Sequence, residues 1–118
     1  MVGRDDPVVV WGSGDQERDF IHMEDVVSAV FATCDEMDPG SPLNLGTGIA
    51  TSFRSLAQLA CEVAGHHAPV QVDASKPEGV FSRVADATLM REHYHPSVDL
   101  RRGVELAMDY LARCQTAG

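Results

Sequence analysis

The chain has 118 residues, of which 44% are hydrophobic and 23% are charged, a composition that fits one globular domain and excludes wholesale disorder. Its formal net charge of −9 argues against nucleic acid or an anionic membrane as a partner, since both bind basic surfaces. No apolar run approaches the roughly 20 residues of a transmembrane helix. Residues 1–6 are too polar for a signal peptide, and the three cysteines lie far apart. We therefore expect a cytoplasmic protein with reduced thiols and no nucleic-acid or membrane partner.

The first half of the chain predicts strands around one helix. Residues 8–11 are β-branched or aromatic and end at a glycine turn, which predicts a strand, with residues 18–22 as its partner in a small ribbon. Apolar residues at helical spacing predict a helix from Glu24 to about Met37. Residues 43–45 predict a brief buried strand before a second glycine turn.

The second half predicts three further helices and one strand. A hydroxyl side chain at 51–52 can cap a helix that ends at Gly65, and residues 69–73 alternate like a strand. Asp86 can cap a short helix, and a final helix follows Pro96. Because the strands are few and short, the pattern predicts an α+β domain or a piece of an α/β protein.

Motifs for catalysis or cofactor binding are weak. The turn from Gly46 to Thr51 superficially matches a dinucleotide loop, but its third position is not glycine, so we interpret it as a turn before a capped helix. The histidines lack the spacing of a metal site, and His22 is expected to be structural. No serine or cysteine has an evident base beside it. We therefore predict no catalytic residue, no metal site and no cofactor-binding residue.

Trp11 and Arg18 form a candidate binding pair. An indole and a forked guanidinium on one ribbon could stack on a base and pair with a phosphate. The alternative is a ribbon packed by Trp11, with Arg18 in a surface ion pair with Glu17 or Asp19. The residue pattern alone leaves both interpretations open.

Longer segments resemble a known family. Residues 10–14 (VWGSG) and 18–26 (RDFIHMEDV) are similar to a segment of the extended short-chain dehydrogenase/reductases, a family of nucleotide-sugar epimerases, reductases and dehydratases. Residues 44–48 (NLGTG) resemble the turn that follows there. Residues 73–79 (DASKPEG), with Arg83 after them, resemble a stretch typical of its GDP-L-fucose synthase branch.

The resemblance implies the C-terminal, substrate-binding domain of an NAD(P)-dependent enzyme. In this family a preceding Rossmann domain carries the glycine-rich loop and a Tyr-x-x-x-Lys pair, whereas Tyr94 and Tyr110 have no lysine four residues later. By resemblance, residues 1–118 form a small α+β domain that is a fragment of a larger enzyme. Such a chain would bind no NAD or NADP by itself, while the parent enzyme uses one of them.

The resemblance also implies the site. Trp11, Arg18, Glu78 and Arg83 match positions that bind the nucleotide-diphosphate sugar, although Glu78 stands where the family has a shorter aspartate. The expected partners are that sugar and the missing Rossmann domain. A surface that once faced that domain would favour a homo-oligomer. The alternative function is a catalytically inactive binding or assembly module with the same fold.

Overall fold

The structure is a computed structural model that describes residues 6–116. The polar residues 1–5, on which the expected absence of a signal peptide rests, lie outside the described residues. The elements in chain order are β1 (Val8–Trp11), β2 (Glu17–Arg18), α1 (Met23–Thr33), β3 (Thr51–Ser52), α2 (Phe53–Ala64), β4 (Val70–Asp73), β5 (Ser82–Arg83), α3 (Thr88–Arg91) and α4 (Leu100–Thr116). This confirms the predicted α+β class with short strands and four helices.

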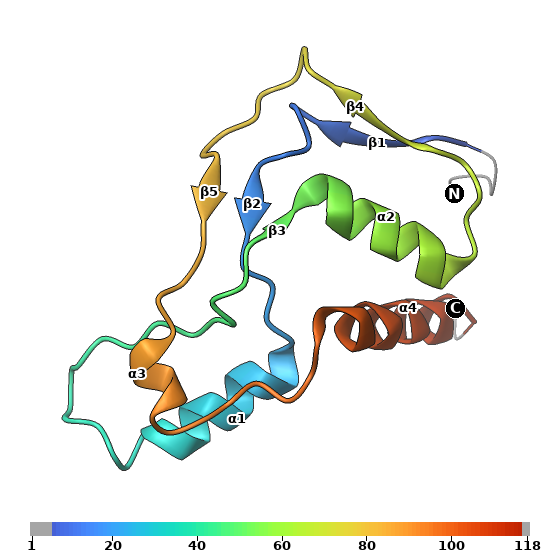
Figure 1. Ribbon diagram of the computed structural model, residues 1–118. Helices are drawn as coiled ribbons and strands as arrows, with labels where there is room; N and C mark the ends of the chain where they lie inside the picture. Colours follow the sequence, from blue (N-terminus) through green and yellow to red (C-terminus); the bar gives the residue numbers. More distant parts are fainter. Residues whose placement is uncertain (1–5, 117–118) are drawn as a thin grey trace.

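The molecule is flat and open (Figure 1). Strands β1 and β4 and helix α2 lie at one end, α1 and α3 lie at the other, and α4 runs beside α2. Its extents are 51 × 37 × 21 Å and its radius of gyration is 16.9 Å, against roughly 13.5 Å for a compact chain of this length. The accessible surface is 8083 Å², against roughly 6,200 Å² for a compact protein of this mass. This chain alone therefore leaves a large surface uncovered.

The hydrophobic core is correspondingly small. Its buried apolar residues are Ala29 on α1 and Ala87 and Met90 at α3, with Leu43 and Leu45 packed against them. A chain of this length could bury a larger single core, but within residues 6–116 the buried apolar residues form only this small cluster.

The predicted ribbon of residues 8–11 and 18–22 is wrong. Strand β1 instead pairs in parallel with β4, with Val8 opposite Val70. Glycines at positions 12 and 14 adopt φ of 79° and 78°, and the chain leaves β1 there without forming a hairpin. The backbone carbonyl of Gln16 then accepts a hydrogen bond from Phe53 N, which directs the chain into a second sheet.

The second sheet has the order β3-β2-β5. Strand β2 pairs antiparallel with β3 and parallel with β5. Each of these strands has only two residues, and the small sheet joins three distant segments of the chain. It places Arg18 directly beside Arg83.

Helix α1 begins near the predicted residue but ends at Thr33, four residues early. The structural role predicted for His22 is confirmed, because its Nδ1 accepts a hydrogen bond from Glu24 N at the helix start. Acidic residues follow Thr33, and negative charge is unfavourable at a helix C-terminus. The chain continues there as turns, in which the amides of residues 36 and 37 both bond the Thr33 carbonyl.

Residues 43–45 do not form the predicted strand. The two leucines face the small core, but no other strand lies beside this segment among residues 6–116. A strand needs a neighbour to satisfy its backbone groups, so this unpaired segment has no regular secondary structure.

The remaining helices follow the sequence pattern. Ser52 caps α2 through its hydroxyl, and Gly65 ends that helix in the left-handed conformation at φ 64°. Asp86 bonds the amide of Thr88, one residue before the cap position of α3. No helix within residues 6–116 is long and apolar enough to cross a bilayer.

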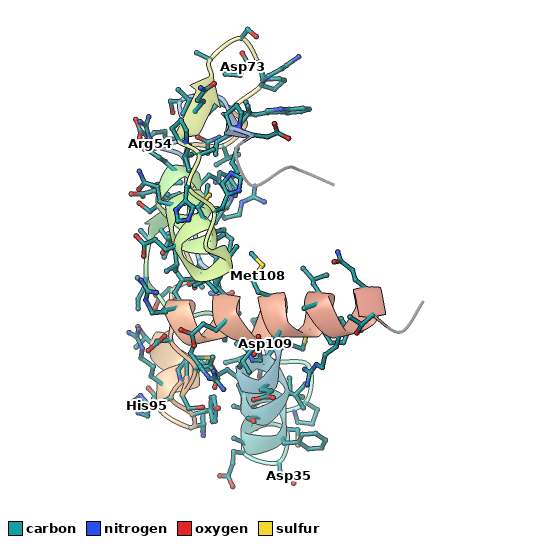
Figure 2. The ribbon with its side chains drawn as sticks, turned by 90° about the vertical axis from the view of Figure 1, so that its right-hand side faces the viewer. Asp35, Arg54, Asp73, His95, Met108 and Asp109 are labelled. Carbon is teal, nitrogen blue, oxygen red and sulfur yellow. The ribbon has the colours of Figure 1, made fainter. Side chains whose placement is uncertain are left out.

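Helix α4 extends beyond its neighbours. Figure 2 shows it lying across the molecule between the α2 end and the α1 end, with Met108 turned towards α2 and Asp109 turned towards α1. Every residue from 109 to 116 is exposed. The second half of α4 thus has no packing partner among residues 6–116.

Candidate functional site

Two of the predicted site residues, Arg18 and Arg83, lie side by side. They pair in register on β2 and β5, so their side chains leave the sheet on the same face. Both line one open depression of about 500 Å³, together with Asn44 and the carboxylate residues Asp19 and Asp86, which already accept hydrogen bonds from other residues. Two cations at neighbouring positions repel each other, so this arrangement favours an anion between them.

Arg18 is held in place by contacts other than an ion pair with a carboxylate. Its Nη1 donates to the carbonyls of Glu17 and Val80 at 2.6 and 2.8 Å. The guanidinium carbon lies 5.4 Å from the centre of the Phe53 ring. These contacts fix the plane of the guanidinium and leave its Nε and Nη2 without a hydrogen bond to the described residues.

The ion pair predicted as the alternative for Arg18 does not form. The described residues contain three ion pairs, which are Arg54–Asp15, Arg101–Glu62 and Arg102–Glu105. Neither Arg18 nor Arg83 takes part in one of them. Glu17 meets Arg18 through its backbone carbonyl, and its carboxylate instead accepts from Ser82 Oγ.

Trp11 lies at the end of β1 and is 60% exposed. With Val10 it lines an almost wholly apolar pocket of about 410 Å³, which helix α2 closes with Phe53, Leu56, Ala57 and Ala60. The Lys76 ammonium lies 5.7 Å from the centre of the indole. A cation over a π face is favourable, and the indole face stays close to water.

Phe53 connects the two halves of the candidate site. It lines the apolar pocket beside Trp11, and the Arg18 guanidinium lies over its ring. The structure therefore brings Trp11, Arg18 and Arg83 onto one connected region, with an apolar part and a cationic part.

Glu78 has a different environment from the other predicted residues. Its Oε2 accepts a hydrogen bond from Ser13 N at 3.2 Å. Its Cβ and Cγ lie 3.0 Å from the point where a side chain on Gly12 would begin. Glu78 thus holds the 73–79 loop against the β1–β2 turn, and only Gly12 allows this close approach.

Gln16 was not found by sequence reasoning. It is 3% exposed, and its Nε2 donates to the Trp11 carbonyl at 2.7 Å. Its Oε1 has no hydrogen-bond partner among the described residues. Gln16 therefore fixes the backbone that carries the indole. A lone glutamine in a turn gives no sequence signal for such a role.

Asp19 joins three segments from within. Its carboxylate accepts hydrogen bonds from Thr47 N and Oγ1, from Gly48 N and from Ala85 N. Burial would raise the pKa of Asp19, but these hydrogen bonds outweigh it and hold the pKa below its ordinary value. The amides of Thr47 and Gly48 in the 46–51 turn thus bond Asp19 and are not free to bind a dinucleotide phosphate.

Asp25 likewise bonds helix α1 to the segment before α4. It is fully buried and accepts from Tyr94 Oη at 2.6 Å, from Ser97 N and Oγ, and from Val98 N at 3.0 Å. Burial would raise the pKa of Asp25. The backbone amide of Ser97 and the other donors outweigh that effect and lower it.

The described residues hold no group of three potential metal ligands. The three cysteines are all free thiols. The arrangement of the two arginines, Phe53 and Trp11 can hold an anion beside an apolar ring system.

The comparisons with known proteins bear on the fold and the family. Residues 1–46 match the model of the NAD dependent epimerase/dehydratase family. The solved UDP-glucose 4-epimerase of Thermotoga maritima, with UDP-glucose, matches with a TM-score of 0.83 and 26% identity over 93% of this chain and 36% of that one. The chain belongs to the NAD-dependent epimerase/dehydratase family, the extended short-chain dehydrogenase/reductases.

Within that family the chain is similar to GDP-L-fucose synthases. It is 35% identical over 112 residues to the putative GDP-L-fucose synthase 2 of Oryza sativa subsp. japonica, which covers 94% of this chain. It is also 35% identical over 108 residues to the GDP-L-fucose synthase of Escherichia coli K12, which covers 82% of this chain. The chain spans about a third of the length of these relatives, at 32% and 33%.

Proposed function

We propose that residues 1–118 are the substrate-binding portion of an NAD(P)-dependent nucleotide-sugar epimerase/reductase of the GDP-L-fucose synthase type. In the intact enzyme, hydride transfer and epimerisation beside a keto group would take place on the bound sugar. The proposed ligand is a nucleotide-diphosphate sugar, and the proposed setting is the cytoplasm. The pairing of Arg18 and Arg83 on adjacent strands is the observation that carries the proposal.

The diphosphate belongs beside the two arginines. A guanidinium presents two parallel N–H donors that match two phosphate oxygens, and Arg18 keeps Nε and Nη2 for that purpose. Arg83 lies on the neighbouring strand and adds a second positive charge. The formal net charge of −9 would repel such a ligand at long range, but exposed charges beyond about 8–10 Å are screened at physiological salt.

The nucleobase belongs beside Trp11. The apolar pocket between β1 and α2 offers flat aromatic surface next to the cationic depression, and Phe53 borders both. A base stacked on Trp11 would displace or share the face now covered by Lys76. Glu78 and Gln16 would support this end by holding the 73–79 loop and the Trp11 backbone.

The role of these residues in catalysis would be to fix the sugar. Binding the diphosphate and base away from the reacting carbon orients that carbon and lowers the barrier through positioning. The nicotinamide cofactor would supply the hydride, and the 46–51 turn does not fit its phosphates. The groups that hold the cofactor would therefore belong to the remaining part of the parent enzyme.

Calorimetry on the intact polypeptide that carries residues 1–118 tests the proposal. We expect saturable binding of GDP and of a GDP-sugar, with weaker binding of UDP and dTDP. The double variant R18A/R83A should abolish that binding. The matched control R101A/R102A removes two exposed arginines of α4 that are already paired with carboxylates and should leave binding unchanged. Equal loss in both variants, or no binding by the parent protein, would contradict the proposal.

A further inference from the structure

A cavity of about 350 Å³ lies between the 46–51 turn and the segment that leads from α3 into α4. None of the four predicted site residues lines this cavity, so it is separate from the region that holds Trp11, Arg18 and Arg83. Ligand pockets have volumes of about 300–1,000 Å³, and an apolar cavity of about 150 Å³ already holds benzene. The cavity is therefore large enough for a small organic molecule with a single ring.

One part of the cavity wall is apolar. Phe20, Val98 and Leu100 line it, and the same three residues also line a second cavity of about 170 Å³ between α2 and α4. Leu56 and Val104 line only the second cavity. An apolar group that packs against the three shared side chains is removed from water, which favours its binding.

Arg91 brings a positive charge to another part of the wall. Its Nη2 donates to the Thr47 carbonyl. A side chain on Gly48, whose φ is 74°, would begin 2.9 Å from that nitrogen, so only glycine leaves the guanidinium its place against the turn. The ion pairs of the described residues do not include Arg91. Its remaining N–H groups make no hydrogen bond to the described residues and are available to a ligand.

His95 lines the same cavity from the segment between α3 and α4 (Figure 2). It is exposed, and its ring nitrogens make no hydrogen bond to the described residues. The lining includes one carboxylate, that of Asp99, which already accepts a hydrogen bond from Arg102 N at 2.8 Å. An unpaired guanidinium and an imidazole thus face a ligand here, and they favour one with negative charge.

We propose that this cavity is a second ligand site, which binds a small carboxylate that carries one apolar group. The carboxylate would pair with Arg91 and accept a hydrogen bond from His95, because a guanidinium matches the two oxygens of a carboxylate. The apolar group would lie against Phe20, Val98 and Leu100, which distinguishes this ligand from hydrophilic anions. The cavity shares no lining residue with the proposed nucleotide site, so the two sites are independent.

Titration with three related probes tests the proposal on the intact polypeptide that carries residues 1–118. Phenylacetate has both parts of the ligand, phenylacetamide lacks the charge, and acetate lacks the ring. Labelled isoleucine methyl groups report binding, because Ile49 lines the cavity, and the I49V variant assigns its signal. We expect phenylacetate to shift the Ile49 signal with a dissociation constant of about 1–10 mM, as suits a ligand of this size. Phenylacetamide and acetate should bind at least about fivefold more weakly.

Three results would overturn the proposal. The first is an Ile49 signal that phenylacetate does not shift at concentrations well above that range. The second is equal binding of all three probes, which would identify an adventitious additive only. The third is competition by GDP, which would place phenylacetate in the nucleotide site. Unchanged phenylacetate binding at saturating GDP supports two separate sites, and phenylacetate binding by a protein that fails to bind GDP would overturn the proposed function alone.

Matched variants locate the charge. R91Q retains a donor for the Thr47 carbonyl but no charge, so it should weaken phenylacetate binding at least about fivefold and leave phenylacetamide binding unchanged. R101Q alters an exposed arginine of α4 that pairs with Glu62, and it should change neither. Equal effects of the two variants would contradict the pairing with Arg91. If R91Q melts well below the parent protein, the comparison of the three probes on the parent protein still decides.

Discussion

Two carboxylates and two arginines of this molecule differ in what they bond. The carboxylates of Asp19 and Asp25 each accept four hydrogen bonds from other segments of the chain. The guanidiniums of Arg18 and Arg83 have no carboxylate partner among residues 6–116. The carboxylates thus link segments of the fold, while the two arginines are available for the ligand that we propose.

The comparison teaches that the residues that link the fold and those of the proposed binding site are adjacent but different. Arg18 and Asp19 are neighbours in sequence and line the same depression, yet Arg18 has two guanidinium nitrogens without a hydrogen bond to the described residues, whereas the Asp19 carboxylate accepts from the backbone of a turn. Substitutions of the two kinds should therefore have separable effects, and each of the following experiments can break or sharpen that separation.

The largest effect is expected for Arg18→Ala. A bound diphosphate would lose a charged, two-pronged partner, so binding of the nucleotide sugar should weaken by about 2–4 kcal/mol. Arg18→Lys retains the charge without the fork and should raise the Michaelis constant roughly tenfold. Calorimetry and steady-state kinetics on the intact enzyme measure both. Unchanged binding in the alanine variant, with a normal melting curve, would remove Arg18 from the site.

Asp25→Asn should destabilise the protein by about 2–3 kcal/mol, because it leaves a buried amide among donors that matched a carboxylate. Nucleotide binding measured below the melting transition should remain. The exposed Asp35, near the end of the same helix, provides the control, and Asp35→Asn should shift denaturant unfolding by less than about 0.5 kcal/mol. If both variants unfold at the same denaturant concentration, the hydrogen bonds of Asp25 do not stabilise the fold.

Acid should lower the contribution of Asp19 and Asp25 to the stability of the fold. The pKa values of Asp19 and Asp25 are lowered in the folded state from the ordinary value of 3.8. Their contribution is therefore fully present above that value and is lost as pH falls below it through the lowered pKa values. Denaturant unfolding at a series of pH values should show this loss, and it should be smaller in D19N and D25N. An identical pH profile in both variants and the parent would contradict the assignment.

Trp11→Phe should have the smallest effect on binding. A phenyl ring retains a flat apolar face, so the loss of affinity should be about 0.5 kcal/mol, whereas Trp11→Ala should cost about 1–1.5 kcal/mol. Glu78→Ala is the comparison variant. Glu78 contacts Ser13 rather than the pocket, so this substitution would act on binding only through the 73–79 loop. Calorimetry in which Trp11→Ala binds as well as the parent would place the base elsewhere.

Local signals predicted the helices well. The capping hydroxyl before α2 and the glycine after it act within a few residues, so their effect can be read from the sequence. The same is true of His22 before α1 and of the helix after Pro96. These elements depend on nearby residues and hardly on the rest of the fold.

Strand pairing could not be predicted in this way. The partner of β1 is β4, far along the chain, and alternation in residues 8–11 gives no information about which strand it joins. The pairing of Arg18 with Arg83 has the same origin, since it depends on β5 returning beside β2. The family resemblance singled out both arginines, but only the fold shows that they are neighbours.

The parallel pairing of β1 with β4 has a consequence for the order of folding. During synthesis β1 emerges before its partner, which is absent until Asp73 has been made. Contacts between distant segments form slowly, because the intervening loop must close first. Helices α1 and α2 can form before that moment, whereas the end of β1 that carries Trp11 is fixed only afterwards. The indole would thus reach its final position only after β4 has joined β1.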